Sequence, residues 1–146
     1  MFGNGQTVMK WLLSNGKLIS RNDSKYRIDF DRPSKSKGQF AVKQFLKEHC
    51  SGHILFEEIR MPQCLLRVDL LDATIKVAYE YNGVGHEAYN VFYHRNSPLN
   101  YLASIKRDDK KRQILERNGY LLIELYPKDL PLLSKEFFRD KFDLIL

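Results

Sequence analysis

The sequence predicts a single α/β domain, in which a central mixed β-sheet is flanked by helices. With 146 residues, of which 43% are hydrophobic and 12% aromatic, the chain is long enough to bury one core. Short apolar segments with a strand-like pattern alternate with segments of helical periodicity. Their order in the second half is helix, three strands, helix, strand, helix, which is typical of helices packed on a sheet.

For the first 38 residues, the sequence predicts one short helix and otherwise extended or irregular segments. Residues 6–14 (QTVMKWLLS) predict a short helix, stopped by the turn signal Asn15-Gly16. Residues 17–30 predict two short extended pieces, and residues 31–38 a basic connector that contains a proline. We therefore divide the chain at position 33.

Residues 1–33 form an N-terminal extension, a helix plus an extended segment, and residues 34–146 form the core domain. The extension could contact DNA, or it could simply pack against the sheet.

A helix is predicted from about Ser36 to Cys50, and Ser51-Gly52 ends it. At about 100° per residue, one stripe of this helix collects apolar residues, with Gln39 at its edge. The stripe consists of Val42, Phe45, Leu46 and His49.

Three strand candidates follow, at residues 53–59, 65–71 and 75–82. Because side chains alternate between the two faces of a strand, Glu80 and Asn82 should emerge on one side of the third strand. The rest of the core is predicted as a long helix at 99–117, ended by Asn118-Gly119, a buried strand at 120–126 and a last amphipathic helix at 134–142.

Composition limits the function classes. No apolar run approaches the roughly 20 residues of a membrane span, and the first residues lack the features of a signal peptide. Two cysteines, Cys50 and Cys64, give no disulfide framework, so we expect a cytoplasmic protein, in the host cytoplasm if it is encoded by a phage. A net charge of +6 favours a polyanionic partner.

Basic residues gather in and just before the predicted long helix: Arg95, Lys106, Arg107, Lys110, Lys111, Arg112 and Arg117. They could contact nucleic acid. They could equally form a solvated helix face with neighbouring acids.

Asp69 and Glu80 lie inside otherwise apolar strands, where an ionised carboxylate is costly unless it is paired or binds a metal. A hairpin with its turn near Asp72 would bring Asp69 close to Ala78, one diagonal step from Glu80. Two acids that converge in this way favour an oxygen-liganded divalent cation, Mg²⁺ or Mn²⁺. The alternative is that both acids lie on an exposed face of the sheet or at strand ends and pair with Arg67 and Lys76.

The spacing of these acids resembles a known family. Asp69, ten intervening residues and Glu80-Tyr81-Asn82 resemble the core of the PD-(D/E)XK (restriction-endonuclease-like) nuclease superfamily, with Asn82 where that pattern usually has Lys. The following His86, the later D-x-x-K of Asp108–Lys111 and NGYLLIEL are similar to one branch, which contains very-short-patch-repair-like and phage homing endonucleases. The resemblance covers about residues 34–126.

The resemblance implies roles for the core residues. Asp69 would be the central metal ligand, Glu80 a second ligand or an orienter of water, and the Tyr81 carbonyl a third oxygen. Asn82 can donate a hydrogen bond but cannot act as a base at neutral pH. His86 would be a general base or a phosphate contact, or a loop histidine without a role.

Three further positions follow from the same resemblance. Asp108 would reach the site and Lys111 would contact phosphate, although either could belong to a surface pair. Gln39 stands where Glu is common, and because an amide is a poorer ligand than a carboxylate, a second metal becomes doubtful. Glu57 and Glu58 could supply the missing charge, but a solvent role at the end of the strand is expected for them.

The sequence thus predicts a Mg²⁺- or Mn²⁺-dependent endodeoxyribonuclease that acts on double-stranded or branched DNA. The alternatives are a nucleic-acid-binding module that has lost catalysis and a junction-resolving nuclease, which would need a dimer. The expected phosphate contacts are Lys106, Arg107, Lys110, Lys111, Arg95, Lys35 and Lys37.

Other candidate residues carry weaker signals. Cys50, His49, His53, Cys64 and His94 match no known closed zinc set. Trp11 and the aromatic residues between Tyr89 and Arg95 could stack on bases, but most aromatics in a small domain are core.

Overall fold

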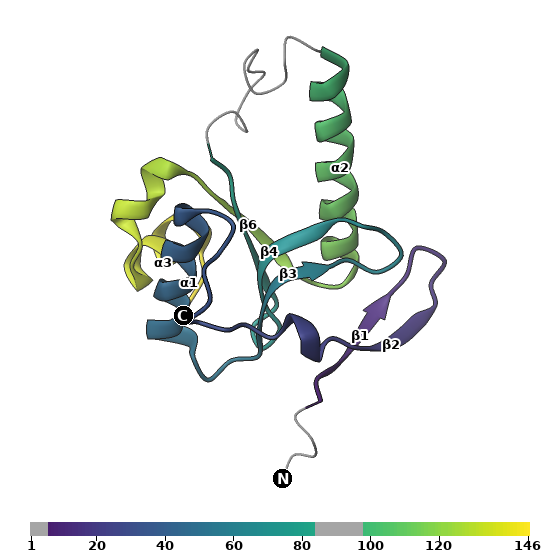
Figure 1. The fold of residues 1–146 in the computed structure, drawn as a ribbon, viewed down its shortest axis with the longest axis horizontal. Coiled ribbons are helices and arrows are strands. Elements are labelled where there is room, and N and C mark those ends of the chain that lie inside the picture. Colours follow the sequence, from purple (N-terminus) through teal and green to yellow (C-terminus); the bar gives the residue numbers. More distant parts are fainter. Residues whose placement is uncertain (1–5, 84–97) are drawn as a thin grey trace.

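The computed structural model describes residues 6–83 and 98–146, without the side chains of residues 98–105 and of Asp108. A four-stranded mixed sheet lies between helices (Figure 1), which confirms the predicted fold class. Its order is β3-β4-β5-β6; the first three strands are antiparallel and β6 is parallel to β5. The strands are β3 (Leu55–Arg60), β4 (Arg67–Asp72), β5 (Val77–Tyr81) and β6 (Leu121–Leu125).

Helices cover both faces of the sheet. The long helix α2 (Pro98–Arg117) precedes β6 and packs on one face through Ile114 and Leu115. On the other face lie α1 (Lys37–Cys50) and α3 (Lys135–Phe142), on the opposite side of the sheet from α2 in Figure 1. Two short 3₁₀ helices, η1 (Ser24–Tyr26) and η2 (Pro127–Leu132), lie before α1 and after β6.

The side chains of β5 alternate as the sequence predicts. Val77 and Tyr79 belong to the core under α1 and α3, while Ala78 belongs to the core under α2. The same alternation places Glu80 and Asn82 toward α2. That face of β5 therefore carries the polar residues of interest.

The predicted helix at residues 6–14 is wrong, because this segment forms a β-hairpin. β1 (Val8–Leu12) pairs antiparallel with β2 (Leu18–Asn22), and Gly16 takes a φ of +83° in the turn. Asn-Gly is a hairpin signal as well as a helix stop, and Met9, Trp11 and Leu13 follow a period of two.

The hairpin is part of the main core. Trp11 is fully buried, stacks on Tyr120 with ring centroids 6.1 Å apart and donates to Asp23 at 2.9 Å. The Asn118 side chain binds both backbone groups of Leu12, at 2.7 and 3.2 Å. Trp11 is therefore a core residue, and stacking on bases is excluded for it.

The turn between β4 and β5 is centred one residue later than predicted. Leu70 pairs with Tyr79 and Leu71 with Ala78, so one further step places Asp69 opposite Glu80 rather than Ala78. Asp72 Oδ1 accepts hydrogen bonds from Thr74 N and Ile75 N, and this Asx-type turn lengthens the connection. The correction brings the two acids closer together than predicted.

The structure also bears on the cysteines and on membrane-spanning segments. Cys50 and Cys64 are both free thiols. Within residues 6–83 and 98–146, no helix combines the length and the apolar character that crossing a bilayer requires.

Candidate metal and nucleic-acid site

Asp69 and Glu80 are held together by reciprocal hydrogen bonds to backbone. Glu80 Oε2 accepts from Asp69 N at 2.8 Å, and Asp69 Oδ2 accepts from Tyr81 N at 2.8 Å. Both carboxylates are largely buried, and neither pairs with Arg67 or Lys76, whose side chains bind backbone carbonyls instead. The two acids thus meet at one point of the sheet, as the sequence predicts, and the exposed-face alternative is wrong.

A local irregularity lies beside Asp69. In the β3–β4 ladder, Glu57 pairs with Leu70 and Ile59 with Val68, but the step between them, Glu58 opposite Asp69, is missing. Glu58 has a φ of +52°, an uncommon and strained conformation for a residue with a side chain. Irregularities of this kind change the direction of side chains. Here Glu58 and Asp69 both contact the ammonium group of Lys35.

Two lysines neutralise the acids. Lys35 Nζ lies 2.7 Å from Asp69 Oδ1 and 3.6 Å from Glu58 Oε2, while Lys111 Nζ lies 2.5 Å from Glu80 Oε1. Burial lowers the pKa of Lys35, but the charge and hydrogen bond of Asp69, together with the charges of Glu58 and Glu80, outweigh that effect and the net shift is upward. The lysines come from the connector before α1 and from α2, so only the tertiary structure brings them to the acids.

The Glu80 carboxyl has an altered pKa. Burial, and secondarily the charge of Asp69, raise its pKa to about 7, while Lys111 opposes the rise. Its side chain is only 13% exposed. The charged form of Glu80 would be stabilised by further positive charge at this place.

Gln39 connects two glutamates of β3, Glu57 and Glu58. Its Nε2 donates to Glu57 Oε2 at 2.9 Å and to Glu58 Oε2 at 3.0 Å. Its Oε1 is buried and accepts from no group among the described residues. The expectation of a solvent role is wrong for Glu57, which is buried and contacts Lys43 Nζ at 2.7 Å.

Lys111, and not Asn82, supplies the polar side chain that contacts Glu80. Asn82 N donates to Leu125 O at 2.7 Å, and its Nδ2 contacts Glu124 Oε1 at 3.4 Å. Within the described part of the chain, the hydrogen bonds of Asn82 thus run to β6 and not to Asp69 or Glu80. Lys111 is the residue that contacts Glu80 directly.

The donor set fits an oxygen-liganded cation. Glu58 and Asp69 contact the same ammonium, that of Lys35, and Glu80 accepts from Asp69 N on the neighbouring strand. The carbonyl of Tyr81 follows Glu80, and Gln39 Oε1 is buried with no hydrogen-bond partner among the described residues. Hard divalent ions such as Mg²⁺ and Mn²⁺ take such ligands. Lys35 and Lys111 must shift for all the carboxylate oxygens to bind an ion.

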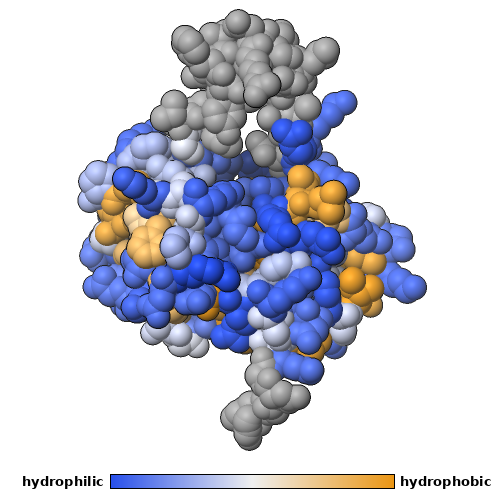
Figure 2. Space-filling view, viewed as in Figure 1, coloured by the Kyte–Doolittle hydropathy of each residue, from blue (hydrophilic) through white to orange (hydrophobic). Residues whose placement is uncertain are grey.

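Further basic residues are exposed on the two helices whose neighbourhood supplies Lys35 and Lys111. Lys106, Arg107 and Lys110 are exposed on α2, and Lys37 is exposed at the start of α1. The predicted contributions of His86 and Arg95, and that of the Asp108 side chain, lie outside the described residues. In Figure 2 the visible face is mostly hydrophilic, and apolar atoms appear in separate groups.

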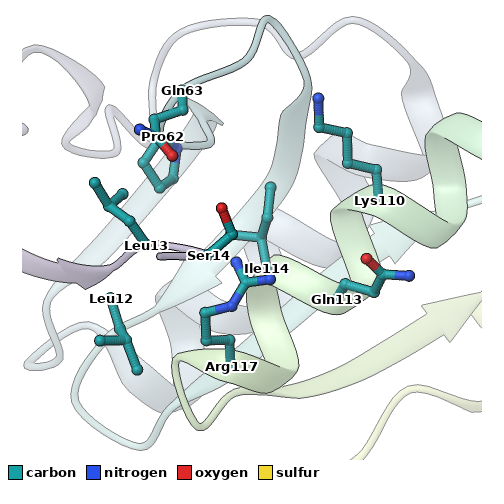
Figure 3. A pocket seen from close by; sticks show the side chains of 9 residues that line it. All are labelled: Leu12, Leu13, Ser14, Pro62, Gln63, Lys110, Gln113, Ile114 and Arg117. Atoms are coloured by element: carbon teal, nitrogen blue, oxygen red, sulfur yellow. The ribbon is translucent and has the colours of Figure 1, made fainter. Parts of the chain in front are cut away.

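A pocket of about 210 Å³ opens where α2 meets the hairpin and the loop between β3 and β4. Lys110 and Arg117 of α2 lie on one side of it, and Leu12 and Leu13 on the other (Figure 3). Ser14, Pro62, Gln63, Gln113 and Ile114 complete its lining. The pocket does not contain the acids.

A second group of metal-ligating side chains lies elsewhere in the sheet. Ligand atoms of Cys50, His53 and Asp72 all lie within 4.8 Å of one another. The sequence analysis includes Cys50 and His53 among the zinc candidates but not Asp72. Asp72 ends β4, about twenty residues further along the chain, and no sequence motif indicates that the end of β4 lies beside the end of α1. The C-x-x-H pattern of Cys50 and His53 is the signal that could have directed attention there.

Comparison with known proteins adds a distant relative. The chain is 40% identical over 60 residues to a protein of Invertebrate iridescent virus 3 described as "Uncharacterized protein 033L". The match covers 41% of this chain, and the chain spans about 30% of the relative's length. No protein-family model and no solved structure matches the chain.

Proposed function

We propose that this protein is a metal-dependent endonuclease that hydrolyses DNA phosphodiester bonds at the Asp69–Glu80 site. The observation that carries the proposal is that these two carboxylates lie side by side, each accepting a hydrogen bond from a backbone N–H of the other's strand, with Glu58 close by and a lysine on each acid. A structural ion pair needs one acid for each base. Here the two largely buried acids, Asp69 and Glu80, lie beside each other, and the partly exposed Glu58 contacts the lysine of Asp69; this excess of acids favours a divalent cation.

The metal would be held by Asp69 and Glu80, with the Tyr81 carbonyl as a further oxygen donor. A bound Mg²⁺ or Mn²⁺ polarises a phosphate and lowers the pKa of its water. The negative charge that develops on the phosphate oxygens in the transition state would be stabilised by the cationic side chains of the site.

Lys111 and Lys35 are suited to that task. Asn82 stands where the resemblance leads one to expect a lysine, and it carries no charge. Lys111 reaches Glu80 from α2 at 2.5 Å, and Lys35 reaches Asp69 from the connector at 2.7 Å. Either ammonium would be close enough to contact a scissile phosphate bound beside the acids.

DNA would lie along the exposed basic side chains. Lys106, Arg107 and Lys110 follow one another on α2, which also carries Lys111 to the acids. Contacts to phosphate fix the strand without reading its sequence. The charge of +6 provides the long-range attraction for this contact.

A plasmid-nicking assay with Mg²⁺ or Mn²⁺ tests the proposal, with a branched substrate as a second arm. Asp69→Asn should abolish cleavage, while Asp140→Asn, the same change at an exposed acid of α3, should leave it intact. Equal cleavage by the wild type and Asp69→Asn would contradict the proposal.

A specific observation favours a second function, that of a nucleic-acid-binding module without catalysis. Gln39 and Asn82 are neutral, and Asp69 and Glu80 already have lysine partners. Calorimetric titration with Mn²⁺ separates the two functions. A nuclease site binds the ion in a manner that depends on Asp69, whereas a degenerate one binds DNA but no ion.

A further inference from the structure

We propose that Cys50, His53 and Asp72 form a second metal site, selective for a thiolate-binding divalent ion such as Zn²⁺. This site does not depend on the proposed nuclease activity. It is distinct from the acid cluster, because Asp72 lies three residues beyond Asp69 on β4, roughly 10 Å along the strand.

The backbone holds the three ligands in place. Cys50 is the last residue of α1, and its carbonyl accepts from His53 N at 2.9 Å, so one tight turn carries both side chains. Asp72 Oδ1 is held by two backbone donors of the following turn, at 2.9 and 3.2 Å. Its Oδ2 is therefore directed at His53 Nδ1, 2.6 Å away.

The two loops that carry the ligands are also bound to each other. Ile54 N donates to Thr74 Oγ1 at 2.8 Å, and Ala73 N donates to Ile54 O at 2.9 Å. The end of α1 and the β4–β5 turn thus keep a fixed separation. A preformed site of this kind loses little conformational entropy when an ion binds.

The chemistry of the donors selects the ion. A thiol, an imidazole and a carboxylate together suit Zn²⁺ or Co²⁺, whereas Mg²⁺ prefers oxygen alone. Bond lengths of about 2.0–2.3 Å require ligand atoms roughly 3.3–3.8 Å apart in a tetrahedron. The widest separations, up to 4.8 Å, therefore need a closure of about 1 Å, while His53 Nδ1 and Asp72 Oδ2, now hydrogen-bonded at 2.6 Å, must move apart by a similar amount as their shared proton leaves that bond.

Binding would replace a proton by the metal. Burial, and secondarily Asp72, raise the pKa of the Cys50 thiol to about 11, so the free protein holds the S–H form. When the metal–sulfur bond forms, the S–H bond breaks and the proton leaves to solvent. Three protein ligands leave a fourth position for water.

Tyr79 provides an independent indication. Its side chain is 1% exposed, and its hydroxyl has no hydrogen-bond partner among the described residues. Tyr79 belongs to the same buried cluster as Cys50, and burial, and secondarily the charges of Cys50 and Asp72, raises the pKa of its hydroxyl. A water on the fourth position of the metal would give this buried group a partner.

Cobalt titration of the intact chain tests the proposal. Co²⁺ should bind one per chain with an intense sulfur-to-cobalt absorption band, and one equivalent of Zn²⁺ should abolish that band. Cys64→Ser, at the other free thiol, and Asp69→Asn, at the acid cluster, should retain the band. Cys50→Ser should lose it.

A second variant guards against unfolding. His53 is 27% exposed, so His53→Gln should keep the fold, as circular dichroism without metal can verify. Its Zn²⁺ affinity should fall by at least about 100-fold, since the loss of an outer-shell partner alone costs 10–100-fold. A folded wild type without the band, a band that persists in Cys50→Ser, or an unchanged affinity in His53→Gln would overturn the proposal.

Discussion

Lys43 is completely buried, and its ammonium contacts Glu57 Oε1 and the Arg32 carbonyl, each at 2.7 Å. Glu57 in turn accepts hydrogen bonds from Ser34 and Gln39. A buried charge is tolerated when it is paired and fully hydrogen-bonded. These contacts attach the connector and α1 to β3, next to the acid cluster, so the lysine supports the site although it does not belong to it.

Lys43→Met should destabilise the protein by about 3–5 kcal/mol, because it leaves the Glu57 charge buried without its cation. Lys47→Met, on the exposed side of the same helix, should change the free energy of unfolding by less than about 0.5 kcal/mol. Urea denaturation measures both. Similar values for the two variants would show that the buried pair contributes nothing.

Glu57 also predicts how stability depends on pH. Burial raises the pKa of this carboxyl, but the hydrogen bonds from Lys43, Ser34 and Gln39 outweigh burial and the net shift is downward. A group with a lowered pKa binds fewer protons when folded, so its contribution is present above the unfolded pKa of about 4.3 and is lost as the pH falls through the folded value.

Denaturation between about pH 3 and 6 should therefore show wild-type stability falling with acid, more steeply than in Glu57→Gln, which cannot titrate there. Parallel curves for the two proteins would contradict the assignment.

At the scale of elements, the site depends on how closely α1 approaches β5. A Cβ on Gly38, in the first turn of α1, would lie 2.0 Å from Cζ of Tyr81. Tyr81 supplies the backbone N–H that holds Asp69. The absence of a side chain at Gly38 thus lets the helix sit beside the strand that carries the acids.

Gly38→Ala should destabilise the protein by about 1–3 kcal/mol, the usual cost of overpacking. Gly52→Ala is the matched control, because a Cβ there meets nothing within 4 Å; it should be neutral or slightly stabilising. The free energy of unfolding in denaturant distinguishes the two. Equal effects would mean that Tyr81 moves aside without cost.

At the scale of the whole molecule, the sheet separates two apolar cores, with α1 and α3 on one side and α2 on the other (Figure 1). Its acids, Asp69 on β4 and Glu80 on β5, are paired with Lys35 of the connector before α1 and with Lys111 of α2. Exposed basic side chains continue from that point along α2. A polyanion bound there would lie next to the acids, which is the arrangement that the proposed hydrolysis requires.

The proposed function predicts a salt dependence of DNA binding. Replacing Lys106 and Lys110 by Gln should lower the slope of log affinity against log salt by about 0.9 for each phosphate that these lysines no longer neutralise. Lys47→Gln, on α1, should leave the slope unchanged. Fluorescence anisotropy at several salt concentrations measures it, and an unchanged slope in the double variant would exclude α2 as the DNA-binding surface.

Local patterns were sufficient for most elements of the core. The helix from about Ser36 to Cys50, the alternation along β5 and the long helix that ends near Asn118 follow from periodicity and end signals, which neighbouring residues carry. The same reasoning failed at residues 6–14. There a helix and a strand fit the short apolar pattern equally well, and only the packing of Trp11 against Tyr120 selects the hairpin.

For the candidate site, the sequence by itself determined that Asp69 and Glu80 converge, because a short turn and a period of two fix which strand residues can meet. Only the tertiary structure decided their partners. Lys35, Lys111 and Gln39 arrive from distant segments, and so do Cys50 and His53 beside Asp72. The physical reason is that contacts between distant segments depend on how helices pack on the sheet, and no local spacing encodes that packing.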